Sequence, residues 1–301
     1  MARDWESTFR AWAKPSSDTE AAKSENAESM IRAAIRESDA LKGRNIEVVA
    51  QGSYRNNTNV RQNSDVDICV RCMDVFFPDY SQVSSLSGES LGFKDASYSY
   101  SQFKNDVGTA LVNKFGSSGV TRGSKAFDVH ANSYRVDADV VACFEHRRYF
   151  RTNSQQLSYV SGTQFQPDRG GKIVNWPHQH YDNGVAKNKL TGSRFKYITR
   201  AIKRLRNEMA EGGIAAADPI PSYLIECLVW NAPDEAFSHE EYLANVRFVL
   251  AHTFNQTVRD ENCHDWCEVS RLKWLFRSEQ PWNRLQAHAF VAAAWTYVGF
   301  E

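Results

Sequence analysis

The sequence predicts an α/β (α+β) fold in two lobes, with strands and flanking helices in residues 1–170 and an α-helical lobe in residues 171–301. Short apolar runs bounded by polar residues, at 46–50, 65–70 and 134–144, predict strands that are buried in a core. Apolar residues at helical spacing predict helices around these strands, and the last third of the chain is helical by composition. A chain of 301 residues is long enough for two separate hydrophobic cores.

The charge balance narrows the class of function. Lysine and arginine together number 36, and so do aspartate and glutamate, so the net charge is zero and does not indicate nucleic-acid binding, although a local basic patch is left open. The N-terminus lacks the apolar segment of a signal peptide, and no apolar run approaches the roughly eighteen residues of a membrane span. We therefore expect a soluble, cytoplasmic protein that acts without a membrane and does not require nucleic acid. Cys69 and Cys143 lie in strand-like runs, as is usual for buried thiols in a reducing compartment.

The first elements bring a Gly-Ser pair to the end of a strand. Helical spacing runs through residues 18–41, with Ser17 or the next residue as its N-cap. The apolar strand 46–50 then leads to Gly52 and Ser53. A turn at this pair can offer backbone N–H groups to phosphate oxygens.

The next strand begins with two aspartates that face the same way. Side chains alternate along a strand, so Asp65 and Asp67 project from one face, after a polar loop that follows Ser53. Two neighbouring anions repel unless a cation lies between them, and Mg²⁺ prefers one or two carboxylates together with waters and phosphate oxygens. The pattern predicts a divalent cation beside a phosphate-bearing substrate. The alternative is a turn residue followed by a solvated strand residue, because Asp-x-Asp alone is common.

The following elements supply a third carboxylate. A loop-like insertion, a helix and a strand are expected in turn at 73–101, 102–115 and 120–129. In the strand 134–144, Asp137 and Asp139 share one face. A third carboxylate on a neighbouring strand is what a site for two metal ions needs, but spacing does not choose between these two. The alternative for either is an edge carboxylate paired with an arginine.

These residues together resemble the DNA polymerase β-like nucleotidyltransferase superfamily, through the Gly52-Ser53 element, the Asp65-x-Asp67 pair and a later strand aspartate before an apolar run. Across nearly its full length the chain resembles the cGAS/DncV-like nucleotidyltransferases of bacterial CBASS anti-phage systems. The resemblance implies a mixed sheet with flanking helices and an α-helical C-terminal lobe. It favours Asp139, which is followed by VVACFE, as the third carboxylate. It also implies that the three aspartates are catalytic and hold two Mg²⁺ (or Mn²⁺) ions, and that Gly52 and Ser53 bind nucleotide.

A basic helix follows in the second lobe. An Asn-Gly turn signal at 183–184 precedes lysines and arginines that gather at the start and along one flank of a helix whose other side is apolar. Such cations neutralise phosphate oxygens that metal ions do not reach. In the family that the chain resembles, a lysine of this helix contacts the triphosphate, which makes Lys196 and Lys203 candidates. The alternative for each is a solvated helix face.

A second candidate pair opens a later helix. Ser222 and Tyr223 follow a proline, and the resemblance implies that the serine reaches phosphate while the tyrosine stacks on a base. Physical reasoning alone supports equally a helix cap and a core aromatic. Further helices are expected at 240–254, 268–276 and 281–298.

Two groups of metal-ligating residue types are not predicted to bind metal. His178 and His180 have no cysteine or third histidine near them in sequence, so we expect surface or hydrogen-bonding roles. Cys263, His264 and Cys267 lack the second ligand pair of a zinc site, and their surroundings favour burial of apolar side chains.

The resemblance implies an enzyme that makes a cyclic di- or oligonucleotide from NTPs, with ATP, GTP or another nucleotide as substrate. This product is a second messenger that activates a cognate effector in anti-phage defence. The alternative enzyme is a nucleotidyltransferase that adds NMP to RNA 3′ ends or to a protein or small molecule, with the same carboxylates and an acceptor surface. The alternative of another class is an inactive nucleotide-binding scaffold. The acidic residues at all three expected positions disfavour the scaffold.

Overall fold

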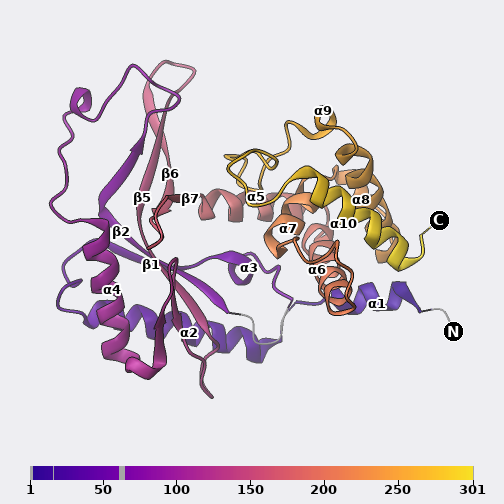
Figure 1. The fold of residues 1–301 in the computed structure, drawn as a ribbon, viewed down its shortest axis with the longest axis horizontal. Helices are drawn as coiled ribbons and strands as arrows, with labels where there is room; N and C mark the ends of the chain where they lie inside the picture. Colours follow the sequence, from indigo (N-terminus) through magenta and orange to yellow (C-terminus); the bar gives the residue numbers. More distant parts are fainter. Residues whose placement is uncertain (1–2, 16, 61–64, 301) are drawn as a thin grey trace. The chain divides into compact units, whose positions relative to one another are not determined.

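The computed structural model describes residues 3–15, 17–60 and 65–300 and divides into two compact units (Figure 1). The sheet unit consists of Ser17–Tyr54 and Gln62–Pro177, and the helical unit of Met1–Ser16, Arg55–Arg61 and His178–Glu301. The sequence predicts one boundary after residue 170, whereas the helical unit takes in two further segments from the first part of the chain.

The sheet unit is built on a mixed sheet, as predicted. Its strands β1 to β5 lie in the order β1-β2-β5-β4-β3, β6 pairs with the outer part of β5, and β7 pairs with β6. Only β2 and β5 run parallel among the strand pairs of the described residues; the others are antiparallel. The bounds are β1 (Ile46–Ala50), β2 (Val66–Asp79), β3 (Val120–Arg122), β4 (Phe127–Val129), β5 (Ala138–Arg151), β6 (Leu157–Phe165) and β7 (Ile173–Asn175).

Two long helices pack on this sheet. They are α2 (Asp18–Glu37) and α4 (Tyr100–Phe115), and their apolar residues share one core with β1, β2, β4 and β5 (Figure 1). The Ser17 side chain accepts the backbone N–H of Glu20, so Ser17 is the N-cap of α2. Helix α2 ends at Glu37, four residues before the predicted end. The short elements of this unit are α3 (Gly52–Arg55), η1 (Glu89–Leu91) and η2 (Ser117–Gly119).

Two predictions for this unit were wrong. The expected loop from residue 73 begins only after β2, because β2 shifts register after Cys72 and then continues to pair with β5 as far as Asp79. Phe76, within the range expected to be a loop, is therefore a strand residue, and its ring lies edge to face with that of Phe93, with ring centres 5.1 Å apart. The expected strand 120–129 is a hairpin of β3 and β4, because the chain turns back between Arg122 and Phe127.

The helical unit has its own core. Seven helices surround it in the described residues: α1 (Trp5–Trp12), α5 (Pro177–Leu190), α6 (Arg194–Glu211), α7 (Ser222–Asn231), α8 (Tyr242–Thr257), α9 (Asp260–Cys263) and α10 (Arg284–Val298). A short 3₁₀ helix, η3 (Asp234–Phe237), joins α7 to α8. The N-terminal α1, which the sequence analysis does not predict, contributes Phe9 to the same core as the C-terminal helices.

Two further predictions fail in this unit. The Asn-Gly signal at 183–184 lies within α5, where Gly184 is buried and a Cβ there would meet Phe195 at 3.9 Å, so helix packing overrides the local turn preference. The expected helix 268–276 is a tight loop closed by a bridge between Cys267 and Trp274, with Arg271 at φ 61°. Leu275 is buried, as expected, but it lies in this loop and not in a helix.

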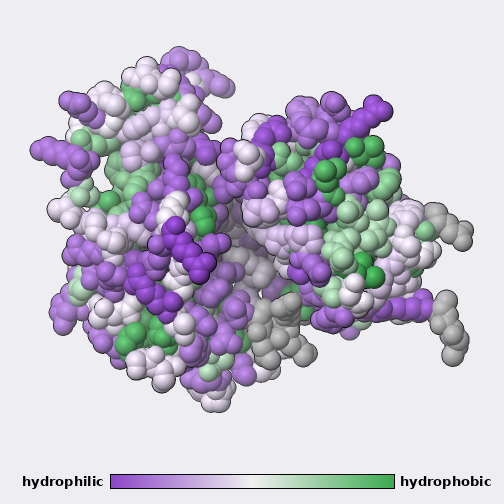
Figure 2. Space-filling model, in the orientation of Figure 1, coloured by the Kyte–Doolittle hydropathy of each residue, from purple (hydrophilic) through white to green (hydrophobic). Residues whose placement is uncertain are grey.

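The outer surface is mixed. Figure 2 shows small apolar groups among polar side chains on the face drawn. Within the described part of the chain, no helix is both long enough and apolar enough to cross a membrane.

Candidate active site

The acidic residues of the sheet unit meet across neighbouring strands. Asp67 on β2 is the in-register partner of Asp139 on the parallel strand β5, and Asp139 is also the partner of Asp128 on β4. Side chains of directly opposed residues share one face of a sheet, so the three carboxylates project from the same face. Asp128 is a residue that the sequence analysis missed, because the hairpin that carries it was read as one strand.

The structure separates Asp139 from Asp137. Asp139 lies within β5 beside Asp67, whereas Asp137 precedes the strand and its Oδ1 accepts the backbone N–H of Ala131. Strand spacing alone does not choose between the two aspartates, but in the structure the carboxylate of Asp137 is hydrogen-bonded to the nearby backbone, and that of Asp139 is the one beside Asp67. Asp65 lies one residue before β2 and is exposed, and residues 61–64 of the loop before it lie outside the described residues.

Gly52 makes room for Asp67. It has φ +66°, and a Cβ built on it would lie 1.9 Å from the Oδ2 atom of Asp67, so no other residue fits without displacing that carboxylate. The backbone N–H of Gln51 donates to the carbonyl of Asp67 at 2.8 Å, and this hydrogen bond holds the backbone before Gly52 close to β2. The Gly-Ser element opens the short helix α3, and Ser53 is half-buried on its first turn.

Electrostatic repulsion is built into this edge of the sheet. Burial, together with the charges of Asp139 and Asp65, raises the pKa of Asp67 to about 7. Burial and the charges of Asp65, Asp128 and Asp137 also raise the pKa of Asp139. The cluster therefore gains stability from any cation that binds it.

These residues fit a divalent cation. Within residues 3–15, 17–60 and 65–300, no three histidine, cysteine or acidic side chains are already arranged to hold an ion. Mg²⁺ needs only one or two carboxylates when waters and phosphate oxygens complete its octahedron. The adjacent Asp67 and Asp139, with the space left by Gly52, supply such a partial set of hard oxygen ligands.

The helical unit contains a pair of cations around one aromatic ring. The Nζ atom of Lys196 on α6 lies 5.9 Å from the ring centre of Tyr181, and the guanidinium of Arg55 lies 5.0 Å from it. Arg55 also contacts the Nδ1 atom of His178 at 3.4 Å. Burial lowers the pKa of Lys196, so an anion that paired with this ammonium group would favour its charged form. Arg55 was missed by the sequence analysis, which took cations from the basic helix alone.

Lys203, a predicted contact of the triphosphate, has its partners within the helical unit. Its side chain is 1% exposed, and its ammonium donates to Glu226 Oε2 at 2.8 Å and to both the carbonyl and the hydroxyl oxygen of Thr58. An ammonium group has three donors, and these three contacts use them all. In this structure Lys203 is therefore an internal ion-pair partner of Glu226, and its contact with a triphosphate stays a prediction.

Ser222 and Tyr223 have specific partners in the helical unit. Pro221, not Ser222, is the N-cap of α7, and the Ser222 hydroxyl accepts from the Arg206 guanidinium at 2.7 Å. The Tyr223 hydroxyl donates to Glu268 Oε2 at 2.9 Å, and burial raises the pKa of this hydroxyl well above its ordinary value.

The ring of Tyr223 is held at its edges and remains partly open. It packs at a tilt against His180 and Trp282, with ring centres 5.6 and 6.0 Å away. The residue is 37% exposed, whereas the burial that raises the pKa of its hydroxyl indicates that this end lies inside the protein. A ring fixed in this way can receive a flat ligand without rearrangement.

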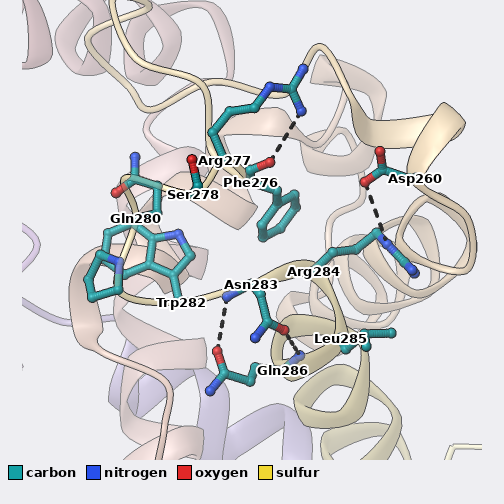
Figure 3. A pocket seen from close by; sticks show the side chains of 11 residues that line it. Asp260, Phe276, Arg277, Ser278, Gln280, Trp282, Asn283, Arg284, Leu285 and Gln286 are labelled. Carbon is teal, nitrogen blue, oxygen red and sulfur yellow. Dashed lines mark hydrogen bonds and ion pairs between the residues drawn. The ribbon is translucent and has the colours of Figure 1, made fainter.

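A surface pocket in the helical unit contains none of the predicted site residues. It has a volume of about 520 Å³ and is lined by the loop before α10 and the start of that helix (Figure 3). Its arginines are engaged in the fold: Arg277 donates to the carbonyls of Phe276 and His264, and Arg284 donates to carbonyls at the end of α8. The chemistry described above lies elsewhere in the chain.

Comparison with known proteins gives consistent matches along the whole chain. Residues 182–299 match the family model for the cGAS/DncV-like nucleotidyltransferase C-terminal helical domain. The chain is 53% identical over 298 residues to the cyclic dipyrimidine nucleotide synthase CdnE of Legionella pneumophila, with 99% of each covered. It is 41% identical over 301 residues to the cyclic dipyrimidine nucleotide synthase CdnE of Cecembia lonarensis, with 100% of each covered.

A solved structure also matches over nearly the whole chain. The CdnE cyclic dinucleotide synthase of Elizabethkingia meningoseptica, determined with GTP and Apcpp, has a TM-score of 0.81 and 35% identity to this chain. The match covers 98% of this chain and 99% of the other.

Proposed function

This chain belongs to the cGAS/DncV-like nucleotidyltransferase family, and from that premise we propose how its residues make a cyclic nucleotide. The chain is a nucleotidyltransferase, a cyclic di- or oligonucleotide synthase whose product is a second messenger in anti-phage defence. The observation that carries the assignment of the site is the in-register pairing of Asp67 with Asp139, next to the space left by Gly52.

Asp65, Asp67 and Asp139 would hold two Mg²⁺ or Mn²⁺ ions. When bound, such ions lower the pKa of the attacking ribose hydroxyl and stabilise the charge on the leaving pyrophosphate. A bound cation offsets the repulsion among these carboxylates; burial and this repulsion raise the pKa of both Asp67 and Asp139. Because the pKa of Asp67 is raised to about 7, its carboxylate is free of the proton, and able to bind a cation, above about pH 7. Asp128 adds negative charge to the same face of the sheet.

The phosphates and the base have separate seats. Gly52 and Ser53 offer the backbone N–H groups of the turn to phosphate oxygens, and Lys196 and Arg55 supply positive charge for the triphosphate. Ser222 reaches phosphate through its hydroxyl, oriented by Arg206. The ring of Tyr223 stacks on a base. Its contacts with Glu268 and Trp282 fix the ring in place for this stacking.

The product proposed for this chain contains pyrimidines. The Legionella and Cecembia proteins are both named cyclic dipyrimidine nucleotide synthases, and the first is 53% identical to this chain. The Elizabethkingia structure instead holds GTP and Apcpp at 35% identity. The product would then activate a cognate effector protein that recognises cyclic pyrimidine nucleotides.

An assay with labelled nucleotides tests the reaction. The pure protein is incubated with each labelled NTP, alone and in pairs, with Mg²⁺ or Mn²⁺, and the products are treated with phosphatase. A phosphatase-resistant product labelled from UTP or CTP is expected. Label transferred to RNA or to another acceptor would indicate the alternative transferase, absence of any product would indicate a scaffold, and a resistant product from ATP or GTP alone would overturn the pyrimidine assignment.

Two single substitutions test the third carboxylate. Asp139→Asn is expected to abolish product formation, whereas Asp137→Asn should leave a measurable fraction, because Asp137 is bound by the backbone of Ala131. The reverse order would mean that the functional register of β5 differs by two residues from the one described.

A further inference from the structure

The chain passes between the two units four times. In the helical unit, a few buried polar side chains bind segments next to these crossings. The crossings lie at 16/17, 54/55, 61/62 and 177/178. Three helices of the helical unit carry the side chains: His180 on α5, Arg200 and Lys203 on α6, and Glu226 on α7. We call these four residues the buried anchor; each is at most 6% exposed.

Arg200 holds two separate segments. Its Nε atom donates to the carbonyl of Ala13 at 2.7 Å, just before the first crossing, and its Nη1 atom donates to the carbonyl of Asn57. Burial lowers the pKa of Arg200 to about 10, which shows the electrostatic cost of placing this guanidinium inside the protein. Its two named partners are backbone carbonyls of the crossing segments.

Lys203, one turn further along α6, holds the next residue of the same segment. It donates to the carbonyl of Thr58 at 3.2 Å and to its Oγ1 at 3.1 Å. The Thr58 hydroxyl donates to Glu226 Oε2 at 2.7 Å, and the other carboxylate oxygen contacts Nε2 of His180 at 2.9 Å. Thr58 is 0% exposed, and the anchor therefore fixes both its backbone and its side chain.

The held segment has an unusual local structure. Asn57 has φ 53°, a left-handed conformation that costs free energy in a residue other than glycine. Its neighbours Asn56 and Asn59 are buried, although polar side chains usually remain exposed. A segment of this kind keeps one conformation only when its surroundings fix it, and here the cations of α6 supply the contacts.

We propose that the buried anchor is a positioning device for the nucleotidyl transfer: its four residues, and Thr58, which Lys203 and Glu226 hold, are positioning residues. Thr58 lies five residues after Ser53 in a stretch that is described without a gap, so fixing it restricts the Gly52-Ser53 turn, which lies against the carboxylate of Asp67. This inference rests on the proposed function of Gly52, Ser53 and Asp67. Misplacing reacting groups by about 1 Å from a distant site can cost about a hundredfold in rate.

A hydroxyl deletion with a matched control separates positioning from stability. Thr58→Val removes the bridge between Lys203 and Glu226 at almost constant volume. Thr257→Val is the control, because Thr257 is also 0% exposed in the helical unit and also bonds through its hydroxyl, to Thr253 and His288. Thr58→Ser restores the hydroxyl.

Three measurements are compared below the melting temperature of each variant. Thr58→Val is expected to lower kcat about tenfold or more, to raise the Mg²⁺ concentration for half-maximal activity, and to speed hydrogen exchange of peptides covering residues 52–60. Thr257→Val should lower the melting temperature similarly without these three changes, and Thr58→Ser should recover most of kcat. Equal kcat and equal exchange in the two valine variants would overturn the proposal.

A second substitution covers the case in which Thr58→Val does not fold. The Asn57 side chain is exposed, so Asn57→Ala removes little packing but strains the left-handed backbone, whereas Asn57→Gly accepts that backbone. Lower kcat and faster exchange in the alanine variant alone would support the anchor, and unchanged values in both would overturn it. The exchange measurement needs no product, so it tests the anchor even if the wild type proved inactive, which would instead refute the proposed function.

Discussion

The two units handle buried acidic groups in opposite ways. In the sheet unit, Asp67 has Asp139 as its in-register neighbour, and burial with the neighbouring charges raises its pKa to about 7. In the helical unit, burial alone would raise the pKa of Glu226, but Lys203 and His180 hold it below its ordinary range. A buried acid that has an internal cation as its partner has a structural role. Acidic groups placed beside each other repel, and this repulsion favours binding of a metal cation.

The largest expected effect is the loss of activity on removing the paired acids. Replacing both Asp65 and Asp67 with alanine should lower product formation by several orders of magnitude, because metal-assisted stabilisation is worth several kcal/mol and each ~1.36 kcal/mol is about tenfold in rate. Steady-state product formation checks this, with circular dichroism to confirm folding. Near-normal turnover in a folded double variant would remove these residues from the site.

The next effect is on stability, in the other unit. Lys203→Met leaves Glu226 buried without its cation, and such a change costs about 3 to 5 kcal/mol. Urea denaturation measures the loss. Lys114→Met, which breaks an exposed pair with Glu37, should change stability little, and adding Glu226→Leu to Lys203→Met should recover part of the loss. Equal losses for Lys203→Met and Lys114→Met would contradict the contrast between the units.

In metal-free protein, Asp67→Asn is expected to raise the free energy of unfolding, the opposite of the effect of Lys203→Met. The folded-state pKa of Asp67 is about 7 against an ordinary 3.8, so the folded state binds the proton more tightly, and raising pH through this window lowers the free energy of unfolding. Asparagine does not ionise, so the variant should be more stable than wild type at pH 8, by at most about 4 kcal/mol. The difference should shrink toward pH 4 and when Mg²⁺ is added. Denaturation curves at several pH values measure it, and a less stable variant at pH 8 would refute the repulsion.

The smallest effect concerns the ring of Tyr223. Tyr223→Ala should weaken nucleotide binding by about 1 to 3 kcal/mol, the usual worth of base stacking, whereas Tyr223→Phe keeps the ring and should bind nearly as well. Calorimetric titration with UTP and ATP, beside thermal melting, separates binding from stability. A large melting shift with unchanged affinity would show that the ring acts only within the fold.

The acidic strands were predictable because their signals are local. Strand alternation predicted that Asp65 and Asp67 share one face; Asp67 lies within β2, whereas Asp65 precedes the strand. The apolar run after Asp139 indicated a buried strand, and both signals depend on a few adjacent residues. The same reasoning could not show that Asp128 joins them, because this depends on the hairpin between β3 and β4 and on its pairing with β5.

The cations were harder to assign. Lys196 and Lys203 look alike in sequence on one basic helix, yet the second is the partner of Glu226, 23 residues further along the chain. No local pattern distinguishes a lysine that faces a buried acid from one that faces a ring. The turn predicted at Asn183-Gly184 fails for the same reason: Gly184 is buried within α5, with Phe195 and Val269 nearby, and the dipeptide alone does not reveal this packing.

Helix α1 links the start of the chain to its end. Its Phe9 is 0% exposed, and α1 packs against α6 and α8. During synthesis at roughly 5 to 20 residues per second, this amphipathic segment waits for about 12 to 50 seconds until α8 has emerged. A fragment limited to the matched region 182–299 would lack Phe9 and leave its place in the core empty. The first helix therefore gains its packing partners only after α6 and α8 have been synthesised.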